Sequence, residues 1–172
     1  FVKFTKNDFL MADNLTIHVD EWLRLEEEER FGQSVVRSVP ECHVEGSLHF
    51  DGKSRVTSDL HLEGTMIVPD SITDEDLELD FETDSEMVYS FDPLKNDDDQ
   101  EIVTVKKDTI DLNPEIFQAI VFEAPMSITR LPRDQYPSGN GWALLSDQDK
   151  KEENDSIDPR WAQLSNFKFE DE

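Results

Sequence analysis

The chain of 172 residues has one cysteine, Cys42, and few basic residues. A single cysteine excludes a disulfide within the chain and a zinc site built from several thiolates. Sixteen Lys and Arg stand against 41 Asp and Glu, which gives a formal net charge of −25. Duplex nucleic acids are bound through Lys and Arg that displace counterions from phosphates, and anionic membranes also attract basic segments. The composition therefore argues against a nucleic-acid groove and against an anionic membrane surface.

Long apolar runs are also missing. The longest, such as residues 119–122 (AIVF), fall far short of the roughly 20 apolar residues that a membrane span requires. No charged segment leads into an apolar stretch as in a secretory signal, so we expect a cytoplasmic protein. Apolar residues make up 36% of the chain, below the usual range of about 45–50%. We therefore expect a modest core and a strongly acidic surface.

The clearest pattern is an alternation of apolar and polar residues in the middle of the chain, which predicts antiparallel strands. Apolar residues occupy alternate positions over residues 42–50, and the alternation resumes over residues 56–62 after a hairpin signal at Asp51-Gly52. Gly64 interrupts it and predicts a bulge or bend. Further strands are predicted over residues 15–19, 77–83, 87–91 and 102–105.

Two helix starts accompany these strands. Asp20 is expected to cap a short helix that runs through residues 21–29. A second helix is expected from about Asn113 to Glu123, with Asn113 as its N-cap and Pro114 at its first position. Because the second helix carries apolar residues on adjoining sides, we expect it to pack against the sheet.

These elements predict an α+β fold, in which a curved antiparallel sheet or an open β-barrel is packed by one main helix. Residues 1–130 are expected to form a single α+β domain. Residues 131–172 read as a polar acidic tail, and within it the spacing of Trp161, Leu164 and Phe167 predicts a short C-terminal amphipathic helix.

No catalytic motif is present: the sequence lacks a P-loop, a dinucleotide-binding glycine pattern, a nucleophile elbow and a zinc-protease helix. His43, His49 and His61 fall on the polar face of the predicted hairpin, where Glu45 or Glu63 would complete a metal site. We favour the alternative that they are ordinary exposed strand residues. Cys42 lies on the apolar face of its strand and reads as a small buried hydrophobe. We predict no catalytic residue, no metal and no cofactor.

Two kinds of residue are candidates for binding a partner. The acidic side chains of residues 26–29 and 97–99 would attract a basic protein, although we favour a solvated helix face as the explanation of the first run. The acids of the second run lack the loop that calcium requires. Apolar residues of the terminal helix would dock on the protein's own domain or in a partner's groove. The predicted partner-binding residues are Glu26, Glu27, Asp97, Asp98, Asp99, Trp161 and Leu164.

Several blocks of the sequence, taken in order, resemble one bacterial family. They are residues 44–48 (VEGSL), 62–69 (LEGTMIVP), 111–114 (DLNP), 123–126 (EAPM) and 158–164 (DPRWAQL). The chain is similar in these blocks to the YceD-like large ribosomal RNA subunit accumulation proteins, and it resembles their Gram-positive branch over roughly residues 40–167.

The resemblance implies a cytoplasmic bacterial protein that large-subunit ribosomal RNA needs for normal accumulation, with no established catalytic activity. Many relatives carry a cysteine after the Val-Pro dipeptide, but this chain has Asp70 there. A carboxylate does not reproduce thiol chemistry, so no metal site is carried over.

The charge and the resemblance together favour a non-enzymatic assembly factor that binds a basic ribosomal or assembly protein, because an acidic surface attracts such proteins at long range. Two alternatives stay open. One is a cofactor of an enzyme that processes precursor ribosomal RNA. The other is a direct RNA binder that uses a local basic spot such as Lys106 and Lys107, although direct RNA contact is disfavoured by the charge.

Overall fold

The structure, a computed structural model, describes residues 2–25, 31, 34–92 and 102–144. The contacts between Cα atoms divide the chain into two units, residues 1–129 and residues 130–172. The predicted acidic tail falls in the second unit, and most of it lies outside the described residues, so its organisation stays a prediction. The same holds for the predicted C-terminal helix.

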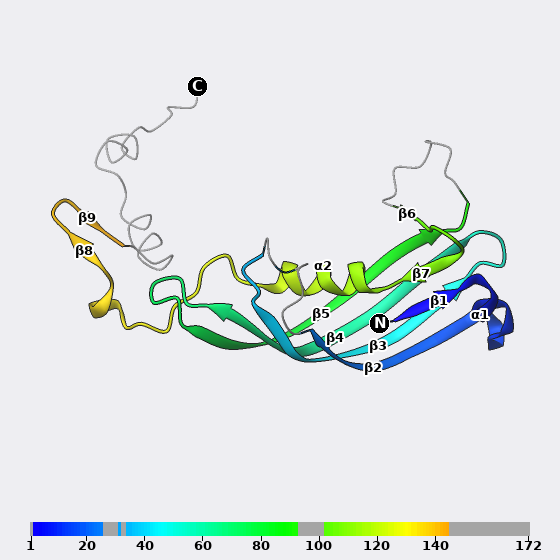
Figure 1. Cartoon of the computed structure of the whole chain (residues 1–172), viewed down its shortest axis with the longest axis horizontal. Coiled ribbons are helices and arrows are strands. Elements are labelled where there is room, and N and C mark those ends of the chain that lie inside the picture. The colour runs from blue at the N-terminus through cyan, green and yellow to red at the C-terminus, as the bar shows by residue number, and fades with distance from the viewer. Residues whose placement is uncertain (1, 26–30, 32–33, 93–101, 145–172) are drawn as a thin grey trace, which may run out of the picture. The chain divides into compact units, whose positions relative to one another are not determined.

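The first unit contains most of the regular structure (Figure 1). Its elements in chain order are β1 (Lys3–Thr5), α1 (Lys6–Met11), the 3-10 helix η1 (Asp13–Leu15), β2 (Thr16–Leu25), β3 (Ser38–Phe50), β4 (Arg55–Pro69), β5 (Asp76–Ser90), β6 (Ile102–Thr104), β7 (Thr109–Asp111) and α2 (Asn113–Glu123). The described part of the second unit has a 3-10 helix, η3 (Arg133–Gln135), and the short strands β8 (Ser138–Gly139) and β9 (Trp142–Ala143).

A five-stranded sheet in the order β2-β3-β4-β5-β6 forms the centre of the first unit. Neighbouring strands from β2 to β5 are antiparallel, and β6 runs parallel to β5. The sheet is therefore mixed, where the sequence predicted an antiparallel one, and it does not close into a barrel. β1 and β7 pair separately as a two-stranded antiparallel sheet. The combination of a sheet with one main helix is confirmed.

The predicted helix at Asp20 is wrong, because Asp20 lies in the middle of β2. β2 pairs with β3 along most of its length, from Thr16 opposite His49 to Leu23 opposite Cys42. Every second pair exchanges backbone hydrogen bonds, each pair adds side-chain contacts, and such tertiary pairing overrides a local capping preference.

The bulge predicted at Gly64 is also wrong. Pairing of β4 continues through Gly64 on both sides, and the irregularity lies in β3 between Ser38 and Glu41. A Cβ atom at position 64 would lie 2.2 Å from the carbonyl oxygen of Glu41. Glycine is therefore needed here for the close approach of two backbones. The strands predicted at residues 77–83 and 87–91 form one continuous strand, β5.

The predicted alternation in β3 and β4 is confirmed, and it divides the sheet into two faces. One face, with Val44, Leu48, Leu60 and Leu62, is buried. α2 lies along the sheet (Figure 1) and adds Ile116 and other apolar side chains to the same core. The opposite face of β2–β5 is polar, and we call it the outer face.

α2 begins at Asn113, with Pro114 in its first turn as predicted. Asn113 is not a side-chain cap. It donates its side-chain amide to the carboxylate of Asp111, and the N-cap position is taken by Leu112. Asp111 therefore ties the first residue of the helix to β7.

The buried acid Glu115 joins α2 to the sheet, although no pattern in the sequence indicates its burial. Its side chain is 1% exposed. The carboxyl oxygens accept hydrogen bonds from Ser58 Oγ at 2.8 and 2.9 Å, Ser85 Oγ at 2.9 Å and the Tyr89 hydroxyl at 2.7 Å. Burial is the main cause that raises the pKa of Tyr89, and the adjacent Glu115 raises it further. The phenol therefore keeps the proton that it donates. We call these four residues the Glu115 cluster.

We predict that Glu115→Ala destabilises the protein by about 2–4 kcal/mol, because the hydroxyl groups of Ser58, Ser85 and Tyr89, which are buried or half-buried, lose this acceptor. Glu115→Gln keeps an acceptor oxygen and should lose less. The measurement is urea unfolding. The matched control is Glu123→Ala at the exposed end of the same helix, which should change the free energy of unfolding by less than about 0.5 kcal/mol. Equal losses in Glu115→Ala and in the control would contradict this role for the cluster.

Candidate functional site

The outer face is organised by strand register into five rows that run across the strands. Residues that pair in neighbouring strands point to the same side of a sheet, so each row is a set of neighbouring side chains. The rows are Glu41–Thr65–Asp80, Trp22–His43–Glu63–Glu82, Asp20–Glu45–His61–Asp84, His18–Ser47–Asp59–Glu86 and Thr16–His49–Thr57–Val88.

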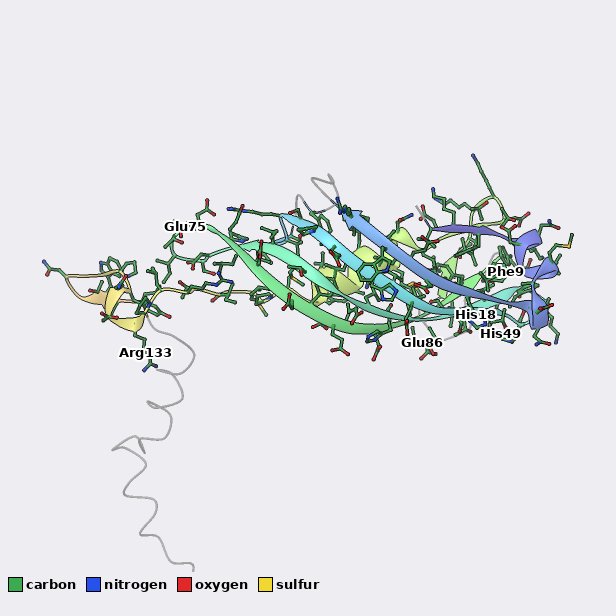
Figure 2. All side chains as sticks on the ribbon, turned by 90° about the horizontal axis from the view of Figure 1, so that it is seen from below. Phe9, His18, His49, Glu75, Glu86 and Arg133 are labelled. Carbon is green, nitrogen blue, oxygen red and sulfur yellow. The ribbon has the colours of Figure 1, made fainter. Side chains whose placement is uncertain are left out.

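Charge on these rows is of one sign. They hold nine carboxylates and all four histidines of the chain, with no Lys or Arg among them. Figure 2 looks onto the sheet from below and labels three of these residues, His18, His49 and Glu86. The rows therefore form one acidic surface in which imidazoles are the only basic side chains, while Arg24 of β2 and Arg55 of β4 lie outside the rows.

His43 is the most highly connected side chain of the outer face. Its Nε2 lies 2.8 Å from Asp20 Oδ1, and its Nδ1 lies 3.4 Å from Glu63 Oε1. The hydrogen bond to Asp20, with a smaller one from Glu63, raises the pKa of His43. The ring of Trp22 stacks on the imidazole, with centroids 4.5 Å apart and an interplanar angle of 12°.

His61 repeats this arrangement on the next strand. Its Nδ1 lies 2.7 Å from Asp84 Oδ1, and its Nε2 lies 3.7 Å from Glu82 Oε1. The hydrogen bond to Asp84 is the main reason that the pKa of His61 is raised. Each imidazole thus lies against two carboxylates, and its raised pKa favours the charged form.

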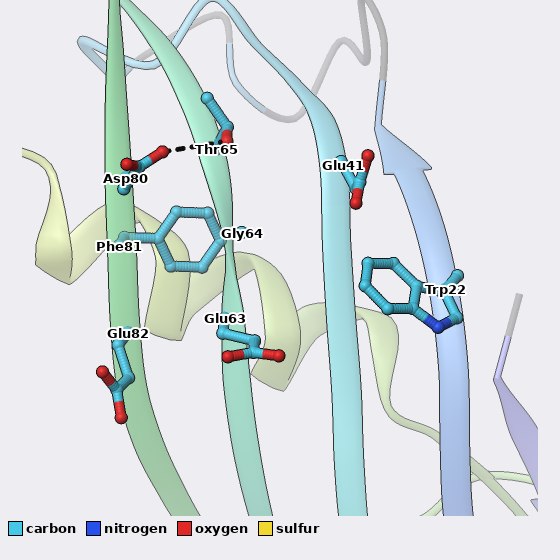
Figure 3. A pocket seen from close by; sticks show the side chains of 8 residues that line it. All are labelled: Trp22, Glu41, Glu63, Gly64, Thr65, Asp80, Phe81 and Glu82. Carbon is cyan, nitrogen blue, oxygen red and sulfur yellow. Dashed lines mark hydrogen bonds between the residues drawn. The ribbon is translucent and has the colours of Figure 1, made fainter.

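A hollow of about 500 Å³ crosses the outer face from Trp22 toward β5. In Figure 3, Trp22 and Glu41 lie beside each other, with Glu63 on β4 and with Asp80 and Glu82 on β5, while α2 lies behind the strands. Thr65 Oγ1 donates to Asp80 at 3.1 Å. A second hollow of similar volume adjoins Trp22 and Glu41 and is also lined by Leu23 and Arg24. The indole therefore lies between two hollows.

The geometry does not resemble a metal centre. In the part of the chain that the structure describes, no three or more His, Cys, Asp and Glu side chains are arranged to hold an ion. The candidate metal ligands His43, His49 and His61, which were considered together with Glu45 or Glu63, lie in three separate rows. Cys42 is buried, and burial raises the pKa of its thiol to about 12, so it is not a nucleophile at neutral pH.

Asp70 is buried and closes a turn. Its Oδ1 accepts from the backbone of Ile72 at 2.9 Å and of Thr73 at 3.0 Å, and its Oδ2 accepts from Thr129 Oγ1 at 3.0 Å. The side chain therefore holds the β4–β5 connection to the segment that follows α2.

All of the predicted partner-binding residues lie outside the described residues, so the structure does not bring them together or separate them. They are Glu26, Glu27, Asp97, Asp98, Asp99, Trp161 and Leu164. Trp22 and Asp20 were not predicted as residues of the sheet surface, because the capping pattern at Asp20 favoured a helix over residues 21–29. The alternation from Thr16 to Leu25 was the available signal.

The fold is an open sheet with one main helix on its buried face and carboxylates on its outer face. The protein is therefore an acidic α+β protein. Residues 58–168 match the family described as "Large ribosomal RNA subunit accumulation protein YceD". Since the match covers more than half of the chain, the chain belongs to this family, which confirms the resemblance seen in the sequence blocks.

One relative is similar to almost the whole chain. The "Uncharacterized protein YlbN" of Bacillus subtilis (strain 168) is 29% identical over 175 residues, which cover 99% of this chain and 99% of the relative. Comparison with solved structures gives no match. Among the described residues, no helix has both the length and the apolar character needed to cross a membrane.

We predict that Asp20→Asn lowers the pKa of His43, measured by NMR titration of the ring signals. The hydrogen bond to Asp20 raises the pKa of His43 in the folded state. It therefore stabilises the fold fully below a pH of about 6.5, the ordinary pKa of histidine, and this stabilisation is lost as pH rises through the folded-state pKa of His43. Asp84→Asn is the control and should act on His61. The prediction fails if Asp20→Asn leaves the His43 midpoint unchanged or moves both midpoints equally.

Proposed function

We propose that this protein is a non-enzymatic, cytoplasmic factor of bacterial ribosome biogenesis that supports accumulation of large-subunit ribosomal RNA. It acts by binding a basic ribosomal or assembly protein. Membership of the YceD family supports the ribosomal role, because the family is described by RNA accumulation and not by a reaction.

The observation that carries the binding mode is the charge of the outer face, with nine carboxylates and no Lys or Arg in its rows. Ribosomal proteins are generally basic, since they contact phosphates. A surface of opposite sign raises the rate of encounter with them and selects against acidic partners. The acids predicted at Glu26, Glu27 and Asp97–Asp99 would extend the same attraction.

One observation favours direct RNA binding as a second candidate. Lys3, Lys106 and Lys107 line a cavity of about 430 Å³ near β6 and β7. Lys3 is partly neutralised there, because its Nζ lies 3.1 Å from Asp111 Oδ2. The direct binder does not use the acidic rows, which repel phosphates, and no observation on the described residues favours the cofactor of an RNA-processing enzyme. We therefore rank both below the protein-binding role.

The ribosomal role predicts that depletion of this protein in its own host lowers the ratio of large-subunit to small-subunit ribosomal RNA. The ratio is measured on total RNA. Restoring the chain should recover the ratio. An unchanged ratio after depletion would contradict the role.

The binding mode predicts that Glu45→Gln, Asp59→Asn and Glu86→Gln together weaken binding to purified basic large-subunit proteins by about tenfold at about 50 mM salt. These three acids lie in the rows, but they hydrogen-bond to neither His43 nor His61. The matched control neutralises three exposed acids elsewhere, with Glu75→Gln, Asp108→Asn and Glu123→Gln. Equal weakening by both sets would assign binding to net charge, and no weakening by the first set would refute the outer face as the binding surface.

A further inference from the structure

Trp22 is the exception to the polar character of the outer face. Its side chain is 61% exposed, and it is the only aromatic residue in the five rows. One face of the indole is covered by the parallel ring of His43. His43 is in turn held by Asp20 and Glu63, so the orientation of the indole is fixed by hydrogen-bonded neighbours.

Carboxylates lie beside this aromatic ring on the neighbouring strands, and the one basic residue that lines a hollow with it is Arg24, in the second hollow. Glu41 lines both hollows beside Trp22, and its side chain has no hydrogen bond or ion pair to any other described residue. Glu63 and Glu82 follow Trp22 and His43 along the same row. Neighbouring strands lie about 4.8 Å apart, so the row spans about 14 Å from β2 to β5.

We propose that the hollow on the outer face binds an extended, arginine-bearing segment of a basic protein, with one guanidinium stacked on the free face of Trp22 and bonded to Glu41. The segment lies across the strands, along the row that contains Trp22. A second arginine about four residues further along an extended chain reaches about 13 Å, which brings it to Glu63 and Glu82. This inference rests on the proposed function and adds the chemistry of the partner.

Arginine fits this surface better than lysine. Its guanidinium is planar, stacks on aromatic rings and presents a fork of donors that matches a carboxylate, whereas an ammonium group is a compact and strongly hydrated charge. A single-stranded RNA could also stack a base on Trp22. The carboxylates in the same hollow would repel its phosphates, so the charge favours the peptide.

The test is calorimetric titration of the full chain at about 50 mM salt with a short, capped peptide of serine and threonine that carries two arginines four residues apart. Matched peptides carry lysine or neutral citrulline in their place. We expect the arginine peptide to bind about fivefold more tightly than the lysine peptide, and the citrulline peptide not to bind. Binding should also shift the NMR signals of the Trp22 indole N–H and the His43 ring.

Trp22→Leu should abolish the preference for arginine. Trp142→Leu is the matched control, because Trp142 is also an exposed tryptophan, at 58%, and lies in the second unit. Asp20 and Glu63 remain in both variants, and thermal unfolding verifies that each is folded. Equal binding of the arginine and lysine peptides, an unchanged preference in Trp22→Leu, or tighter binding of oligouridine than of the arginine peptide would overturn the inference.

These outcomes are separable from the proposed function. If purified ribosomal proteins bind through the rows while the peptides show no dependence on Trp22, the inference fails and the proposed function stands. If the arginine peptide binds at Trp22 while depletion leaves the ribosomal RNA ratio unchanged, the site stands and the proposed function fails.

Discussion

The register of β2 to β5 is the constraint on which the rest of the structure depends. Side chains alternate between the two faces of a strand, so a slip of one residue would turn Val44 and Leu60 outward and would bring the carboxylates into the core. The Glu115 cluster fixes the β4–β5 part of this register from the buried side. Ser58 lies on β4, Ser85 and Tyr89 lie on β5, and all three hydroxyls reach one carboxyl group on α2. Unlike an apolar contact, these hydrogen bonds do not tolerate a shift.

The outer face that results is costly for the protein alone. Like charges directly opposite each other in a sheet are destabilising, and the register places Glu63 opposite Glu82 and Asp59 opposite Glu86. His43 and His61 relieve part of this repulsion because each bonds to two carboxylates. No row contains a Lys or Arg that would relieve the remainder. A cationic partner would relieve the remaining repulsion between the carboxylates, and this relief would favour its binding.

The sequence predicted those parts of the fold that are set by local patterns, and it failed where distant residues decide. β3, β4 and α2 each carry their own periodicity. β2 was assigned partly to a helix because its strand character depends on pairing with β3, about 25 residues later. β5 was divided in two because Thr83 and Ser85 interrupt its apolar side. Ser85 points inward with the alternation of its strand and donates to Glu115, a partner that alternation cannot reveal.

The same limit applies to the candidate site. Each strand shows which residues face solvent, but the rows exist only once the strands are paired, and Trp22 meets His43 only through that pairing. A net charge of −25 acts at long range and attracts every basic protein alike. Selection among them requires a feature of fixed shape. On the described outer face, the stacked pair of Trp22 and His43 supplies such a feature, because a flat aromatic surface beside an unpaired carboxylate distinguishes a planar guanidinium from other cations.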